Sequence, residues 1–163
     1  MVGTMWGKGR TYDEFKVGEK FVFRLPTVTE GTINNFCCLT GDFNPLHVDI
    51  EVAKQTIHGE RIAPGTLTTS LTFTTFAMLA FGTGMALLEL NFKLPAAVKI
   101  NDTLEVEIEI LDKRPSRKYA DKGGIVHQRM TTRNQHGVVV AEGEAKILIS
   151  KVPSYELLER RAR

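Results

Sequence analysis

The chain has 163 residues, of which 42% are hydrophobic and 25% charged, and its formal net charge is +2 at pH 7. This length fits one domain that can bury about 68–70% of its unfolded surface, so folding requires neither a metal nor a disulfide. A net charge this small argues against the strongly basic surface that binds nucleic acid or an anionic membrane. We therefore expect a soluble globular domain with no nucleic-acid or membrane partner.

The cysteines and the first residues bear on the cellular compartment. The only two cysteines, Cys37 and Cys38, are adjacent in an apolar helical pattern, which favours small core residues in a reducing compartment over a structural disulfide. Residues 1–20 contain no long apolar run followed by a small-residue cleavage site, so no secretory signal is predicted. Together these observations predict a cytoplasmic protein.

Composition divides the chain into a main domain and two short flanking segments. Residues 1–19 are polar and rich in Gly and Lys, and we expect a loose lead-in that docks through Phe15 and Val17. The main domain is expected over residues 20–152. Residues 153–163 are charged and are expected to form a short helix or a frayed tail without a function.

The main domain opens with a strand and a helix. Residues 21–25 form a short β-prone run that Pro26 ends, and Thr29 is a good N-cap for the helix that follows. Apolar residues recur along this helix at a helical spacing, and Gly41 is expected to end it. The chain should therefore change direction directly after Gly41.

The central part of the chain, residues 62–88, contains no charged residue. A membrane span of this length is rejected, because the segment holds many threonines and is broken by Gly82 and Gly84. Between Leu67 and Ala80, apolar residues cover much of a helix's circumference, which predicts a helix buried on most sides.

The second half of the chain reads as strands. In residues 104–110, aliphatic residues alternate with Glu, the pattern of a strand with one buried and one solvated face. Further strands are expected over residues 88–94, 125–132 and 138–149, with a hairpin turn at residues 134–137. With the N-terminal strand this makes about five antiparallel strands against one long helix, an α+β domain.

The stretch 40–65 carries the candidate active-site residues. Asp42 and His47 are five positions apart, a poor spacing for one face of a helix, and Pro45 between them pushes Asn44 out of the α region. A loop is therefore predicted here. In a loop bent at Asn44 and Pro45, the carboxylate and the imidazole can converge on one water molecule, which is what general acid–base catalysis near neutral pH requires.

A metal site is the alternative for part of this stretch. His47 and Asp49 have the His-x-Asp form of an iron site with two histidines and one carboxylate, which also needs a second, distant histidine. His127 falls in a strand pattern and His136 in a hairpin turn, so we expect no metal. His58 is expected to be a surface residue, with contact to a substrate as the alternative.

A group of cations lies between two predicted strands. It consists of Lys113, Arg114, Arg117, Lys118 and Lys122. A solvated charged loop is the simplest interpretation. The alternative is contact with the phosphates of coenzyme A or of a carrier protein's pantetheine arm, because clustered cations attract such anions.

Several motifs along the chain occur together in one known family. They are Leu39-Thr40-Gly41-Asp42-Phe43-Asn44-Pro45-Leu46-His47-Val48-Asp49, Ala53-Lys54-Gln55-Thr56, Arg61-Ile62 before Gly65, Asn91-Phe92-Lys93-Leu94-Pro95, Asn101-Asp102-Thr103-Leu104 and Ala141-Glu142-Gly143-Glu144-Ala145. With these motifs the chain resembles the MaoC-like dehydratases, which include the (R)-specific enoyl-CoA hydratases, from about Tyr12 to Ile149.

The resemblance implies a hot-dog fold, in which an antiparallel sheet wraps a long helix and usually dimerises edge to edge. It also implies addition of water to a trans-2-enoyl thioester, or the reverse dehydration, with Asp42 and His47 as the acid–base pair. The backbone N–H of Gly65 matches the donor that stabilises the thioester oxygen as negative charge develops on it. Asn44 and Asp49 match supporting positions that hold the loop.

The resemblance also implies the partners. The substrate's acyl group is carried by coenzyme A or by an acyl carrier protein, and no metal or redox cofactor is implied. A homodimer or a dimer of dimers is expected, because the edges of the sheet need a cover. Pro64 departs from the family's pattern, which usually has a His before the Gly. The N–H of Gly65 survives this change, because a proline removes only its own N–H.

Two other functions are compatible with a hot-dog fold. A thioesterase of this fold commonly presents a carboxylate from the central helix, and residues 66–81 contain no Asp or Glu. A non-catalytic acyl-binding subunit of a two-chain dehydratase lacks the acid–base pair, which is intact here in Asp42 and His47. We therefore expect a hydro-lyase.

Overall fold

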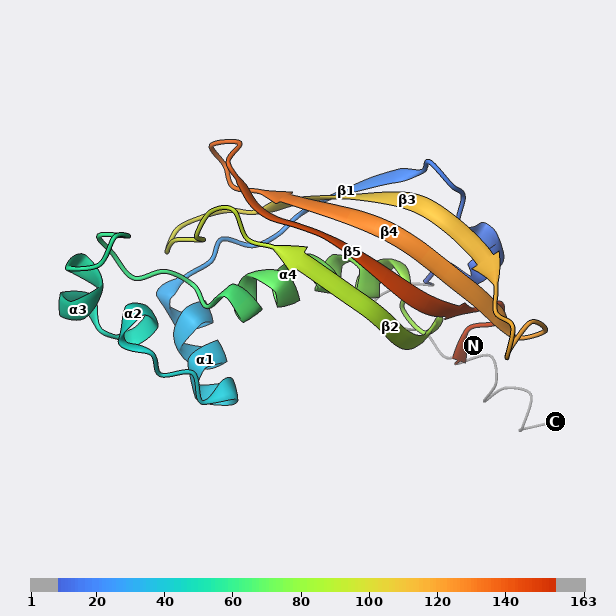
Figure 1. Ribbon diagram of the computed structural model, residues 1–163, viewed down its shortest axis with the longest axis horizontal. Helices are drawn as coiled ribbons and strands as arrows, with labels where there is room; N and C mark the ends of the chain where they lie inside the picture. The colour runs from blue at the N-terminus through green and yellow to red at the C-terminus, as the bar shows by residue number, and fades with distance from the viewer. Residues whose placement is uncertain (1–8, 155–163) are drawn as a thin grey trace.

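Five strands form one antiparallel sheet that wraps around a single long helix (Figure 1). The computed structural model describes residues 9–154. The strands are β1 (Lys20–Arg24), β2 (Gly84–Lys93), β3 (Glu105–Pro115), β4 (Gly123–Arg133) and β5 (Val139–Ser150). The helices are the short 3-10 helix η1 (Tyr12–Glu14) and the α-helices α1 (Glu30–Thr40), α2 (Pro45–Val48), α3 (Ile50–Lys54) and α4 (Gly65–Leu79).

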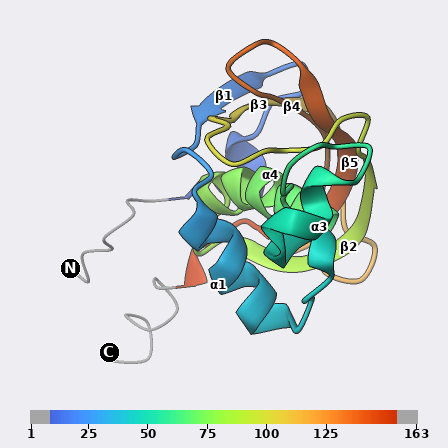
Figure 2. The same ribbon diagram turned by 90° about the vertical axis from the view of Figure 1, so that its left-hand side faces the viewer.

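The strands are ordered β1-β3-β4-β5-β2, and each neighbouring pair is antiparallel. Seen from one end, the sheet curves around α4, and α1 and α3 lie beyond the end of the sheet (Figure 2). This arrangement is the hot-dog fold, so the expected α+β class and the expected number of strands are confirmed. The sheet's two outer strands are β1 and β2, of which β2 is the longer.

The alternation in β3 produces a sheet with two different faces. Val106, Ile108 and Ile110 are fully buried against the helix side, while the glutamates between them face outward. At roughly 25 cal/mol per Å² of buried apolar surface, each such side chain stabilises the fold by about 1.5–3 kcal/mol. The strand extends five residues further than the alternating run predicted, because residues 112–115 pair with the start of β4 beyond an irregularity at residue 111.

The helix α4 is buried on one side only, which corrects the expectation of burial on most sides. Its buried residues are Leu67, Thr68, Thr72, Thr75 and Phe76. Thr66, Ser70 and Thr74 are exposed on the other side, because the sheet of one chain covers only one side of the helix. None of the helices in residues 9–154 is long and apolar enough to cross a membrane.

The hydroxyl groups of the buried Thr72 and Thr75 on α4 are hydrogen-bonded, which offsets the cost of burying them. The Thr72 hydroxyl donates to Thr68 O at 3.0 Å and lies 2.7 Å from the Thr132 hydroxyl of β4. The Thr75 hydroxyl donates to Thr72 O. A buried hydroxyl without such a partner costs about 1–3 kcal/mol.

Residues 9–19, before β1, are packed against the sheet more closely than a loose lead-in, and residues 1–8 of the predicted lead-in lie outside the described residues. Phe15 is 1% exposed, as expected, and its ring stacks on Phe76 of α4 with the centroids 5.5 Å apart. Tyr12 is also buried. The expectation that Val17 docks is wrong, since Val17 is 58% exposed. Tyr12 and Phe15 both pack in the core, whereas Val17 lies directly before the chain turns at Gly18.

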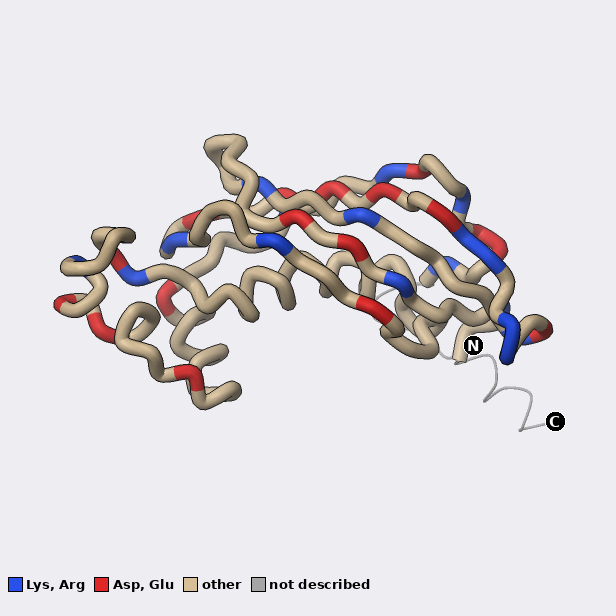
Figure 3. The backbone as a smooth tube through the Cα atoms, viewed as in Figure 1, with Lys and Arg blue, Asp and Glu red and all other residues tan. Residues whose placement is uncertain are grey.

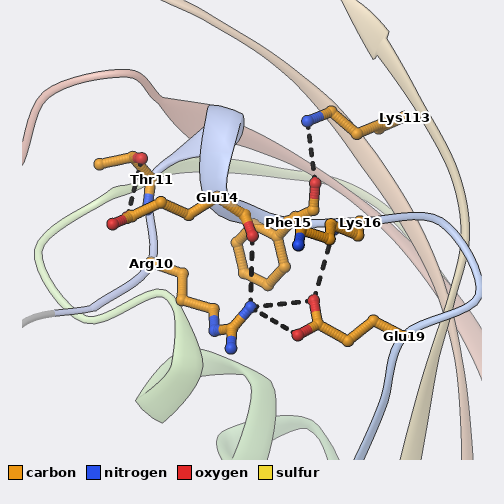
Figure 4. Close-up of polar contacts among 7 residues, drawn as sticks. All are labelled: Arg10, Thr11, Glu14, Phe15, Lys16, Glu19 and Lys113. Carbon is orange, nitrogen blue, oxygen red and sulfur yellow. Dashed lines mark hydrogen bonds and ion pairs between the residues drawn. The ribbon is translucent and has the colours of Figure 1, made fainter.

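Polar contacts fix this segment in place (Figure 4). Arg10 Nη1 donates to both carboxylate oxygens of Glu19, at 2.8 and 2.9 Å. Lys113 Nζ on β3 donates to the main-chain oxygens of Tyr12 and Phe15, at 2.8 and 2.9 Å. One member of the predicted cation cluster therefore anchors the segment instead of lying in a solvated loop.

The two cysteines differ in their surroundings. Cys37 on α1 is fully buried in a cluster with Leu67 of α4, as expected of a core residue, but Cys38 is exposed at the next position of α1. Neighbouring positions of a helix point about 100° apart, so a single buried face cannot hold both. Of the predicted C-terminal tail, residues 155–163 lie outside the described residues.

Candidate active site

The end of α1 sets the position of Asp42. Thr29 caps the start of this helix, and Gly41 ends it in the left-handed conformation, with φ 76° and its N–H bonded to Cys37 O at 2.8 Å. Asp42 is therefore the first residue after the chain turns. Its Oδ1 accepts a hydrogen bond of 3.4 Å from the N–H of Asn44, which fixes the carboxylate relative to the next helix.

His47 lies in a one-turn helix, which corrects the prediction of a continuous loop. Asn44 is non-helical, as expected before a proline, but it acts as the N-cap of α2, and its Oδ1 accepts from the N–H of Leu46 at 3.2 Å. Pro45 occupies the first helical position, where its missing N–H has no intrahelical partner to lose. The loop is thus limited to residues 41–44.

The His47 ring is held by a main-chain oxygen. Its Nδ1 lies 2.8 Å from Ile62 O, and its side chain is 10% exposed. A carbonyl oxygen only accepts, so Nδ1 carries the proton and the neutral ring keeps a lone pair on Nε2. This Nε2 lies 3.9 Å from Oδ2 of Asp42, whose side chain is 40% exposed. The structure therefore brings the two predicted residues together, with Asp42 on the solvent side.

Residues 61–65 belong to the stretch predicted to carry the active site, but the sequence did not predict that Ile62 O would hold His47. Ile62 pairs with Lys99 in an isolated antiparallel bridge, and the N–H of Ala63 donates to Val98 O at 2.8 Å. The buried Arg61 guanidinium is paired with Glu30 in the first turn of α1. These contacts fix Ile62 O, and a main-chain acceptor leaves no signal in the sequence.

Gly65 begins α4, as expected from the sequence. Pro64 is the N-cap, and it has no side-chain oxygen to accept from the first turn. The first N–H groups of a helix have no intrahelical acceptor, so the N–H of Gly65 is available to a ligand at the positive end of the helix dipole. Because Ile62 O holds His47, the helix start and the acid–base pair lie at the same end of the molecule. A methyl group on Gly65 would lie 2.7 Å from Leu94 Cδ1.

Asp49 and the remaining histidines take part in other contacts. Asp49 caps α3, with its Oδ1 accepting from the N–H groups of Glu51 and Val52 at 2.9 and 3.1 Å. His127 lies 2.9 Å from a Glu144 oxygen on the sheet. Within residues 9–154 no three His, Cys, Asp or Glu side chains gather in a way that could hold a metal ion. Neither His127 nor His136 therefore forms such a group with His47 and Asp49.

Electrostatic contact reaches from Asp42 back into α1. Burial raises the pKa of the Cys37 thiol, the carboxylate of Asp42 raises it further, and the guanidinium of Arg61 acts in the opposite direction. Cys37 is therefore held in the thiol form beside the site. It is a packing residue there, since the thiolate is the nucleophilic form of cysteine.

His58 lines a cavity of about 600 Å³, whose wall includes Lys99, the bridge partner of Ile62. The cavity lies between residues 57–60, residues 96–102 and the β4–β5 turn, which includes His136. Glu60 accepts from Lys99 Nζ at 2.7 Å on its wall, and this hydrogen bond raises the pKa of Lys99. His58 is therefore a half-buried surface residue on the wall of this cavity.

The chain is similar to several known proteins over most of its length. The family described as MaoC like domain matches residues 14–134. An (R)-specific enoyl-CoA hydratase of Rhodospirillum rubrum is 29% identical over 138 residues, which cover 85% of this chain and 90% of the relative. A 3-hydroxybutyryl-CoA dehydratase of Methylorubrum extorquens is 26% identical and covers 86% and 84% of the two chains. The solved structure of an R-hydratase from Pseudomonas aeruginosa has a TM-score of 0.76 and 31% identity, covering 87% and 86%.

Proposed function

Because the chain belongs to the MaoC-like domain family, we propose that it adds water to trans-2-enoyl thioesters to give (R)-3-hydroxyacyl thioesters, or catalyses the reverse dehydration. The similarity to a hydratase and a dehydratase that are named for coenzyme A thioesters supports this reaction class. The observation that carries the proposal is the distance between Asp42 and His47.

The distance of 3.9 Å between His47 Nε2 and Asp42 Oδ2 suits one shared water molecule. It is too long for a direct hydrogen bond, whereas two bonds of about 2.8 Å that meet at an angle of about 90° span it. Both atoms are acceptors, because Nδ1 of His47 carries the ring proton. A water placed between them directs one proton to each and turns its lone pairs outward, toward a substrate.

In the hydration direction, a lone pair of this water forms the bond to C3 of the enoyl group. The C2–C3 π pair moves toward C2 and the thioester oxygen, which becomes enolate-like. His47 Nε2 accepts the proton that leaves the water, and the protonated pair returns one proton to C2, so atoms and charge balance. Asp42 orients the water and stabilises the imidazolium while it exists.

The negative charge on the thioester oxygen requires a donor, for which we propose the N–H of Gly65. Support comes from the uncapped start of α4 and from the lack of a side chain at this position. Asn44 and Asp49 act as supporting residues through the caps of α2 and α3. Every step is a proton transfer or a carbon–oxygen bond change, so the proposed mechanism uses no redox cofactor and no metal.

The proposal is tested by measuring the loss of conjugated absorbance with crotonyl-CoA, octenoyl-CoA and branched enoyl-CoA thioesters. We expect hydration of at least one of them, with the (R)-alcohol as product. Thiol release from a saturated acyl-CoA, followed with a thiol reagent, is the control. Rapid thiol release with unchanged absorbance of all enoyl thioesters would show a thioesterase instead.

We also propose a homodimer joined along β2. This edge strand is exposed over nearly its whole length, and it carries apolar side chains on both faces, with Met85, Leu87, Leu88 and Leu90 each 42–52% exposed. A cavity of about 350 Å³ between α4 and β2 opens beside it and is lined mainly by apolar residues. An unpaired apolar edge favours association, and a second copy closes it by isologous pairing.

Sedimentation tests the dimer. The wild-type chain should sediment as a dimer or a dimer of dimers, and Leu88→Lys should shift it to a monomer. Val22→Lys is the matched control, because Val22 is 60% exposed on β1, the other edge of the same sheet. A wild-type chain that is a fully active monomer at micromolar concentration would rule out this interface.

A further inference from the structure

The hairpin between β3 and β4 carries four exposed cations that the proposed reaction does not use. They are Arg114, Arg117, Lys118 and Lys122. Lys and Arg gather at this end of the sheet in Figure 3. Within residues 9–154, no ion pair joins any of the four to a carboxylate. Lys118 Nζ lies 5.3 Å from the centroid of the Tyr119 ring, a contact that does not neutralise it, so the charge of all four is available to an anion.

The hairpin has a defined conformation, which distinguishes it from a flexible charged loop. The N–H of Ser116 donates to Gly123 O at 3.2 Å, and the buried Ser116 hydroxyl accepts from the N–H of Tyr119 at 3.1 Å. From the neighbouring segment, Lys151 Nζ donates to Ala120 O at 3.0 Å. Such preorganisation lowers the conformational entropy that a ligand must remove on binding.

Within one chain, the hairpin cannot serve the site of the same chain. The pair of Asp42 and His47 lies near α2, at the opposite end of the sheet from the hairpin (Figure 1). The strands β3 and β4 of 11 residues each separate the two ends. At about 3.3 Å per residue, this separation is about 36 Å.

Pairing of two copies along β2 reverses this relation. A two-fold axis through the free edge of β2 makes the two β2 strands antiparallel, so the two chains point in opposite directions along the joined sheet. The hairpin end of one chain then lies at the same end as α2 of the other chain. The four cations of each hairpin are thereby brought to the end at which the other chain's acid–base pair works.

We propose that, in this dimer, the β3–β4 hairpin of each chain binds the phosphate groups of the coenzyme A thioester whose acyl end reacts at Asp42 and His47 of the other chain. This inference rests on the proposed function and on the proposed dimer. The phosphates of coenzyme A are dense anions that guanidinium and ammonium groups bind without a closed pocket. The hairpin then acts on substrate binding and leaves the chemical step unchanged.

The first test compares crotonyl-CoA with crotonyl-pantetheine, which lacks the phosphates and the adenosine of coenzyme A. Arg117→Glu and Lys118→Glu should each raise the KM for crotonyl-CoA about 10–100-fold with kcat unchanged, the effect of losing one charged hydrogen bond. The KM for crotonyl-pantetheine, which has no phosphate, should not change. Lys20→Glu on β1 is the matched control, with the same charge change and an expected KM within about twofold of wild type. An unchanged KM for crotonyl-CoA in both hairpin variants overturns the inference.

The second test uses mixed dimers and decides whether the hairpin acts across the dimer. One chain carries Asp42→Asn and a normal hairpin, and the other carries a normal pair with Arg117→Glu and Lys118→Glu. In the mixed dimer, the normal pair of the second chain meets the normal hairpin of the first, so activity with wild-type KM should appear on mixing. If mixing restores no such activity, the hairpin does not act in trans and the inference is wrong.

A binding measurement separates this inference from the proposed reaction. Asp42→Asn protein should bind crotonyl-CoA in a calorimeter, and adding Lys118→Glu should weaken binding about 10–100-fold. If Lys118→Glu weakens crotonyl-CoA binding but the wild-type protein hydrates no enoyl thioester, the hairpin binds coenzyme A and the proposed hydratase activity is wrong. If the wild-type protein hydrates enoyl thioesters but neither Lys118→Glu nor added salt changes CoA binding, the proposed role of the hairpin is wrong and the proposed reaction stands. Dependence on Lys118 that occurs only with an acidic acyl carrier protein thioester would also overturn the assignment to coenzyme A.

Discussion

The two ends of α4 have different surroundings. At the last turns, Phe76 is 1% exposed and stacks on Phe15, within a buried cluster that includes residues of β3, β4, β5 and η1. At the first turn, Gly65 is exposed and Pro64 provides no side-chain cap. One helix therefore contributes to stability at one end and leaves backbone donors free at the other. Substitutions at the two ends should accordingly affect different measurements.

The largest effect is expected beside the first turn, at the acid–base pair. Asp42→Asn and His47→Gln should each lower the hydration rate about 10²–10⁴-fold, the usual contribution of one general acid or base. The double variant should lose much less than the product of the two, because the residues act on one water. Steady-state rates with an enoyl-CoA measure this.

These variants also check the contrast between the two ends, since their thermal unfolding should remain close to that of the wild type. A loss of rate that tracks a loss of folded protein would contradict a catalytic role. Equal wild-type rates in both folded variants would move the reaction away from this pair.

The next largest effect is expected at the other end of the helix. Phe76→Ala should lower the free energy of unfolding by about 3–5 kcal/mol, because it removes a buried ring and leaves a cavity against Phe15. Denaturant unfolding measures this. The control is Thr74→Ala, whose exposed hydroxyl donates only to Ser70 O within the helix, and it should change stability by less than about 0.5 kcal/mol. Similar losses in both variants would show that Phe76 is not part of the core.

A somewhat smaller effect is expected at the first turn itself. Gly65→Ala should lower turnover about 10²–10³-fold, the usual value of one oxyanion donor, if the added methyl group displaces the thioester oxygen from the N–H. The fold should survive, because the methyl group meets only the movable end of the Leu94 side chain. Enoyl-CoA hydration rates measure the effect.

A second variant separates the two explanations of that loss. Leu94→Ala removes the contact with the new methyl group, so Gly65→Ala combined with Leu94→Ala should remain slow if the substrate is displaced. Recovery of turnover in the combined variant would show that the loss came from the contact between the new methyl group and Leu94. Wild-type turnover in Gly65→Ala alone would place the oxyanion donor elsewhere.

The smallest effects are expected at the two cysteines, which lie on α1 between the site and the core. Cys37→Ala should lower the free energy of unfolding by about 1 kcal/mol, and Cys38→Ala should be neutral, because only Cys37 is buried. In the folded protein one thiol per chain should react with a thiol reagent. Reaction of both thiols at equal rates would show that the end of α1 opens readily.

The sequence by itself determined those features that depend on neighbouring residues. The alternation in β3 places Val106, Ile108 and Ile110 in the core. Thr29 and Gly41 delimit α1 as predicted, because caps act over three or four residues. The spacing of Asp42, Asn44 and His47 indicated a site. The helix α2 was not predicted, because its four residues are too few for a helical pattern, which needs two or more turns.

The tertiary structure alone decided which distant residues meet through main-chain groups, because every residue carries these groups. Ile62 O holds the His47 ring from 15 positions away, and a main-chain oxygen has the same chemistry at every position. Lys113 does not lie in a solvated loop with the other predicted cations, because its ammonium donates to the main-chain oxygen of Phe15. The strand β2 is exposed because it lies at the edge of the sheet, and strand order depends on how the whole chain folds. Local patterns fix which face of an element is apolar, whereas only the assembled fold determines what that face meets.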